Sequence, residues 1–237
     1  MRKTNCLNWI APVLVATGLC ETASAQTSLA DVYSTIQSTN SSLWRSMENL
    51  RQTEKRTEAL GSPAPAARQA AVPQATAPQV ATPAARPITD TDFQPYPGRI
   101  LLDQVSASIP SRQQKLEMRT MYNTVFAMFE SERRKYNIAA AAAWAVGISL
   151  EIERGREPSE AEYHQLTWYF NQALATSSQF YYMQPQQKQI LYESLIMTGG
   201  TAAVLAYQGT RQNDAAMQQQ ARELARTILS NWPPQYQ

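Results

Sequence analysis

The sequence predicts an all-α protein, a bundle of four to five helices preceded by an amphipathic helix and a linker rich in proline and alanine. In the C-terminal part of the chain, apolar residues recur at the 3.6-residue spacing of helices. No long segment there alternates with the period of two that a half-buried strand requires. Helix-capping residues also stand at several of the expected helix ends.

Residues 1–25 have the pattern of a secretory signal peptide. Arg2 and Lys3 precede a short apolar run, and the small residues Ala23–Ala25 follow it. The run is shorter than the roughly 20 residues that a transmembrane helix needs. We therefore expect cleavage before Gln26 and a periplasmic or secreted protein of a bacterial envelope, with no transmembrane segment in the mature chain.

Residues 26–60 are expected to form an amphipathic helix. Leu29, Ile36, Leu43 and Leu50 recur every seven residues and make a narrow apolar seam. Two interpretations stay open: a short coiled coil that makes a homo-oligomer through residues 28–60, or a single helix that packs on its own domain.

Residues 61–95 are expected to be a disordered linker. Alanine, proline, glutamine and threonine dominate it, and several prolines up to Pro87 interrupt any helix. A helical domain is then expected over residues 96–232, with residues 233–237 as a tail.

Five helices can be placed in this domain. Gly155 is suited to cap the end of the second helix, and Ser159-x-x-Glu162 forms a capping box that starts the third. Pro185 precedes the fourth helix, and Pro233 ends the fifth. The expected ranges are about 111–136, 138–154, from 159, from 185 and 217–232.

Three glycines fall within these helices. A glycine inside a helix costs about 1 kcal/mol relative to alanine, so a compensating contact is expected. Gly147 in the second helix and Gly199-Gly200 in the fourth therefore predict close helix crossings, with the surface formed by Ala140, Ala143 and Gly147 as a suitable partner. A kink that shapes a pocket is the alternative.

The composition argues against several classes of function. The chain has 21 basic and 19 acidic residues, which gives no electrostatic case for binding nucleic acid. Cys6 and Cys20 lie in the signal segment and His164 is the only histidine, so neither a metal site nor a cofactor is expected. The mixed charges between Glu151 and Glu157 predict a solvated helix end.

Glu193 and His164 are the weak catalytic candidates. Glu193 is an acidic residue in an apolar helix, where a carboxyl can carry a raised pKa. The pair Glu193-Ser194 resembles the catalytic Glu-Ser of lytic transglycosylases, although no Gly-Leu-Met-Gln follows it here. His164 has Glu160 one turn before it, which could orient it as a general base. A rim position or a charge pair is the alternative for Glu193, and a boundary position is the alternative for His164.

The chain as a whole resembles an uncharacterised bacterial family of signal-peptide-bearing helical proteins with a domain of unknown function. The resemblance covers about residues 101–229. It is carried by the Ala-rich helix Ala139–Gly155, the helix start Pro158–Glu162 and the stretch Ile190–Thr198. These are packing motifs, so the resemblance implies a fold and no site residues. We expect a non-enzymatic module that binds a protein or another cell-envelope component; the alternative is a peptidoglycan-directed hydrolase or lyase that uses Glu193 as acid or base.

Overall fold

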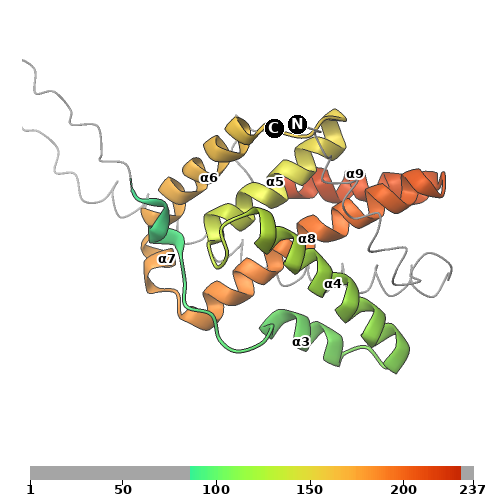
Figure 1. The fold of residues 1–237 in the computed structure, drawn as a ribbon, viewed down its shortest axis with the longest axis horizontal. Coiled ribbons are helices and arrows are strands. Elements are labelled where there is room, and N and C mark those ends of the chain that lie inside the picture. The colour runs from blue at the N-terminus through green and yellow to red at the C-terminus, as the bar shows by residue number, and fades with distance from the viewer. Residues whose placement is uncertain (1–85, 231–237) are drawn as a thin grey trace, which may run out of the picture.

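The computed structural model describes residues 86–230, and within them the chain is helical without strands (Figure 1). The predicted signal peptide, the helix over residues 26–60, the linker before residue 86 and the tail lie outside the described residues. The elements in order are η1 (Ile88–Thr91), α3 (Ile100–Ala107), α4 (Arg112–Glu132), α5 (Ile138–Arg154), α6 (Glu160–Ala175), α7 (Ser178–Tyr182), α8 (Pro185–Arg211) and α9 (Ala215–Ser230).

Two helices, α5 and α8, form the centre of the bundle. Every residue of α5 from Ile138 to Glu151 is buried, and so is most of α8 from Leu191 to Leu205. α5 packs against α6, α8 and α9, while α8 also contacts α3, α4 and α9. Figure 1 shows α5 and α8 enclosed by the other helices. The predicted all-α bundle is confirmed, with apolar faces turned toward these two helices.

Local capping residues define several helix ends. The side chains of Ser111 and Asn137 accept hydrogen bonds from the first turns of α4 and α5. Ser159 and Glu162 form the predicted capping box at the start of α6. Gly155 ends α5 with φ of 68°, the left-handed conformation that glycine adopts at low cost.

The structure differs from the sequence prediction in three places. α4 ends at Glu132, four residues before the expected end, and residues 133–137 form a loop. The short helices α3 and α7 were not expected. Residues 86–95, which the sequence assigns to the linker, belong to the fold: Thr91 is fully buried, and Ile88 and Phe93 pack against the core. The proline-rich composition of residues 86–95 does not reveal that they belong to the fold, because the side chains that contact them are distant in the sequence.

The buried glycines lie at close contacts, as the sequence predicted. A Cβ on Gly199 would come within 3.0 Å of the Ala145 backbone in α5, so the two central helices approach closely there. A Cβ on Gly147 would overlap the ring of Tyr163 in α6. The surface around Gly147 therefore receives an aromatic ring, and the close approach at Gly199 is to Ala145.

Among the described helices, α8 alone is long and apolar enough to pass a length-and-composition test for crossing a membrane. Its apolar window is 83% buried inside the fold. Such burial is typical of a core helix at the centre of a bundle.

We predict that Gly200→Ala destabilises the domain. A Cβ at Gly200 would overlap Cγ1 of Val125 in α4, a stiff β-branched side chain. Overpacking of this kind costs about 1–3 kcal/mol, which exceeds the gain of up to about 1 kcal/mol in helix propensity. Thermal or urea unfolding of the variant measures the net loss.

The control is the double variant Gly200→Ala/Val125→Ala. Val125→Ala alone opens a cavity and destabilises the domain, but the added methyl group at residue 200 refills that space. The double variant should therefore lose less stability than the sum of the two single losses. A Gly200→Ala variant as stable as the parent would contradict the close packing.

Candidate functional site

An irregular segment, residues 86–99, crosses the bundle before α3; we call it the strap. It begins beside α6, where the amide side chains of Asn171 and Gln172 hold its backbone. Asn171 Nδ2 donates to the carbonyls of Arg86 and Pro87, both at 3.0 Å. Gln172 accepts from the N–H of Arg86 and donates to its carbonyl, also at 3.0 Å. These bonds replace the backbone pairing that an irregular segment lacks.

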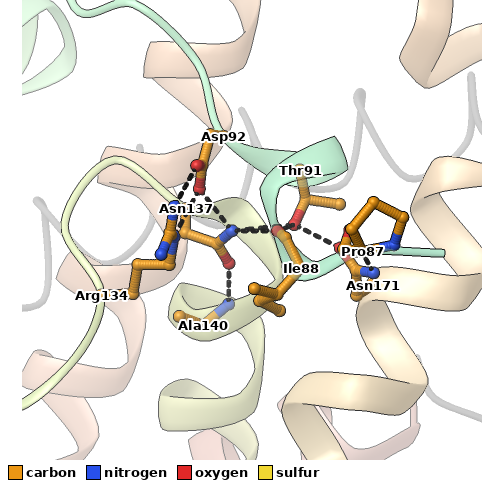
Figure 2. A network of polar contacts seen from close by, with 8 residues as sticks. All are labelled: Pro87, Ile88, Thr91, Asp92, Arg134, Asn137, Ala140 and Asn171. Carbon is orange, nitrogen blue, oxygen red and sulfur yellow. Dashed lines mark hydrogen bonds and ion pairs between the residues drawn. The ribbon is translucent and has the colours of Figure 1, made fainter.

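Asn137 at the start of α5 holds the middle of the strap, as Figure 2 shows. Its Nδ2 lies 2.8 Å from the Ile88 carbonyl, 3.0 Å from Thr91 Oγ1 and 2.8 Å from Asp92 Oδ1. Its Oδ1 accepts from Ala140 N–H at 2.8 Å and so caps α5. Asn137 is fully buried, and one side chain therefore both starts the central helix and positions the strap.

Two neighbours of Asn137 complete this network (Figure 2). Thr91 Oγ1 donates to Asn171 Oδ1 at 2.9 Å, which links the α5 and α6 anchors. Arg134 forms a two-pronged ion pair with Asp92, with N–O distances of 2.8 and 2.5 Å. Burial raises the pKa of Asp92, but the hydrogen bonds from Arg134 and Asn137 outweigh it and hold that pKa below its usual value.

The far end of the strap is held by α8. Gln189 Oε1 accepts from the Tyr96 N–H at 2.6 Å, and its Nε2 donates to the Gly98 carbonyl at 3.0 Å and to Glu193 at 2.8 Å. Glu193 accepts the N–H groups of Ile100 at 3.1 Å and Leu101 at 2.7 Å. Arg99, the N-cap residue of α3, makes no side-chain cap, so Glu193 caps this helix from α8.

The strap encloses a pocket of 460 Å³ against α8 and the α4–α5 loop. Half-exposed tyrosines stand in its lining: Tyr96 is 43% exposed and Tyr136 is 36% exposed. Tyr136 takes φ of 54°, a left-handed conformation that is strained for a bulky residue. Its carbonyl accepts the N–H of Phe93 at 3.0 Å, which fixes the loop to the strap. The lining residues are Phe93, Pro95, Tyr96, Pro97, Gly98, Arg99, Tyr136, Gln189 and Tyr192.

The charged groups at the pocket are paired with each other. Arg99 forms an ion pair with Glu130 at 2.7 Å and lies 4.0 Å above the ring of Phe126. Tyr192 donates its hydroxyl to the same Glu130 at 3.2 Å. Burial is the largest cause that raises the pKa of Tyr192, so this hydroxyl stays protonated and remains a donor.

The two predicted catalytic candidates, Glu193 and His164, both lie outside the pocket lining. Glu193 is fully buried, both of its oxygens accept hydrogen bonds, and it is absent from the pocket lining. Burial raises its pKa, as expected for a carboxyl in an apolar helix, while Gln189 and backbone N–H groups lower it. His164 is exposed, and its expected partner Glu160 pairs instead with Arg133 at 3.0 Å.

Sequence reasoning missed the strap residues and the anchors Asn137, Asn171 and Gln189, and it singled out Glu193 as a catalytic candidate, not as an anchor. The anchors Asn137, Asn171, Gln189 and Glu193 are separated from their strap partners by 45 to 93 residues, so no local spacing reveals the contacts. One signal was available: four polar side chains stand inside or at the start of otherwise apolar helices.

Within residues 86–230, no group of three or more acidic, histidine or cysteine side chains could hold a metal ion.

Glu151 also differs from its prediction as part of a solvated helix end. It lies one turn after Gly147, on the face of α5 that turns toward α6, and is only 4% exposed. Neither carboxylate oxygen has a hydrogen-bond partner among the described residues. A buried carboxyl without partners favours its neutral form.

A model of a family of unknown function (DUF6683) matches residues 7–232 of the chain. The protein therefore belongs to this family, which confirms the membership that its packing motifs indicated. Neither a curated protein nor a solved structure matches the chain. Any function has to be inferred from the pocket and its anchors.

Glu151 leads us to predict that stability falls as the pH rises. Burial first, and the nearby Glu157 second, raise the pKa of Glu151 from its ordinary 4.5 to about 7. The folded state thus binds this proton more tightly than the unfolded chain does. Its contribution is complete below pH 4.5 and is lost as the pH rises through 7. We expect the free energy of unfolding to decrease by on the order of 2 kcal/mol over this range.

Glu151→Gln should remove much of this pH dependence and stabilise the domain at alkaline pH; urea unfolding across the pH range measures both effects. Glu153→Gln is the matched control, since Glu153 lies on the same helix but pairs with Arg226. It should keep the slope of the parent. A parent protein whose stability is flat or increases between about pH 5 and pH 7 would contradict the assignment.

Proposed function

We propose that this DUF6683 family member is an exported, non-enzymatic binding module that holds a component of the cell envelope in the strap pocket. The observation that carries the proposal is the pocket itself. Its 460 Å³ lies in the range of small-ligand sites, and its half-exposed tyrosines offer contact area at low entropic cost.

Preorganisation supports binding by this pocket. Asn137 and Asn171 fix one end of the strap and Gln189 and Glu193 fix the other, all from buried positions on the helices. A ligand would therefore meet a wall that is already ordered, and less of its binding free energy would go into ordering the protein.

Two sequence features support an envelope location. The signal-peptide pattern of residues 1–25 indicates export, and the proline-rich residues before the strap are suited to hold the domain away from an attachment point. The seam in residues 28–60 would add avidity if it forms a homo-oligomer.

The contacts of Glu193 favour binding over hydrolysis. A general acid must reach the bond that it protonates. Both oxygens of Glu193 are instead engaged by the start of α3 and by Gln189, and it is absent from the pocket lining. The hydrolase or lyase alternative requires this carboxyl to leave those partners.

The test is retention of the exported protein on envelope material. We expect the full chain, expressed in a bacterial host, to appear in the periplasmic or secreted fraction. Its mass should be that of a chain that begins at Gln26. It should sediment with washed envelopes. The pocket variant Tyr96→Ala/Tyr136→Ala should lose that retention at least about tenfold, because exposed aromatic anchors dominate such contacts.

The matched control is Tyr181→Ala/Tyr182→Ala, which removes two exposed tyrosines of α7 outside the pocket lining. It should be retained like the parent. Equal retention of the pocket variant, or a protein left in the cytoplasm, would contradict the proposal. Release of soluble wall fragments by the parent but not by Glu193→Gln would favour the enzyme alternative.

A further inference from the structure

The aromatic side chains of the pocket form one continuous wall. Phe93, Tyr136 and Tyr192 contact each other with centroid distances of 5.3 to 6.2 Å and inclined rings. Tyr96 on the strap adds a fourth ring, and its 43% exposure makes it accessible to a ligand.

The charges around the wall point to an uncharged ligand. A cation would find no free carboxylate beside Arg99, because Glu130 is already bound by Arg99 and by Tyr192. An anion would have to compete for Arg99 with Glu130, which is bound at 2.7 Å and is itself held by Tyr192. The pair therefore leaves no net charge at this edge of the pocket.

Residues 95–97 of the strap leave no free backbone N–H group at the pocket. Pro95 and Pro97 have no N–H, and the N–H of Tyr96 between them is taken by Gln189 at 2.6 Å. A peptide that binds by strand addition needs alternating donors and acceptors, which three successive residues here do not provide. A ligand rich in hydroxyl donors fits this wall better.

We propose that the strap pocket binds a neutral saccharide unit, with a sugar ring stacked on the exposed tyrosines and its hydroxyl groups donated to strap carbonyls. A sugar meets all three conditions: it is uncharged, it carries many hydroxyl donors, and one face of its ring consists of C–H groups. Those groups pack on the electron-rich face of an aromatic ring. This inference rests on the proposed function and names the ligand class for the same pocket.

The test is titration of the full mature chain with the neutral disaccharide N,N′-diacetylchitobiose, followed by calorimetry or by saturation-transfer NMR. We expect a dissociation constant on the order of 1 mM or below. Tyr96→Ala and Tyr136→Ala should each weaken binding at least about tenfold, whereas Tyr136→Phe keeps the ring and should stay close to the parent. Tyr181→Ala should bind like the parent, and melting curves show whether each variant is folded.

Two comparison ligands show whether a negative result concerns the saccharide class or the pocket itself. De-acetylated chitobiose, which carries ammonium groups, should bind more weakly because Glu130 is engaged by Arg99 and leaves no free carboxylate to pair with them. The peptide Ala-Pro-Ala-Pro should not bind. If the peptide binds in a Tyr96-dependent manner while the disaccharide does not, the saccharide class is wrong but the pocket remains a binding site. If the disaccharide binds equally to all variants, or not at all at millimolar concentration, the inference is overturned. Failure of the proposed function is a separate result, namely envelope retention that does not depend on the pocket.

Discussion

Fixing an irregular backbone segment against a helix bundle requires hydrogen-bond partners for its polar groups, and this requirement governs the site in this protein. Apart from the single turn of η1, the strap has no helical backbone pairing of its own. Asn137, Asn171 and Gln189 supply these partners from α5, α6 and α8, and Glu193 caps α3 where the strap ends. An unpaired buried polar group costs about 1–3 kcal/mol, so removing one anchor side chain leaves its partly buried backbone partner in the strap exposed to part of that cost. The pocket lies between the strap that these side chains position, α8 and the α4–α5 loop.

The helix bundle places the anchors where the strap needs them. α5 and α8 approach closely through Gly199 and Ala145, and the start of each helix faces the strap. Asn137 lies at the start of α5, while Gln189 and Glu193 occupy the first turns of α8, one turn apart. The same side of the bundle therefore receives both ends of the strap. Tyr136, next to Asn137, is carried into the pocket lining by the loop that Asn137 terminates.

The sequence predicts those features whose contacting residues lie close together along the chain. Gly155 and the Ser159–Glu162 box act within a few residues, and the helix boundaries beside them agree with the structure. α3 was missed because its cap comes from Glu193, more than 90 residues along the chain. The same distance hid the role of Glu193, whose burial in an apolar helix was visible but whose partners were not. The linker prediction extended through residue 95 because composition alone describes the strap, and composition contains no information about Asn137 or Asn171.

The central claim is that polar anchors on the helices order the strap, and amide hydrogen exchange of an Asn137→Ser variant tests it most directly. Serine keeps the cap of α5, since its hydroxyl can accept the Ala140 N–H, but it lacks the amide donor that holds the strap. In the parent, the N–H groups of Phe93 and Tyr96 should be protected from exchange. In the variant, that protection should be lost in the strap while the amides of α5 and α8 stay protected. Strap amides that exchange freely in the parent, or that are equally protected in the variant, would contradict the account.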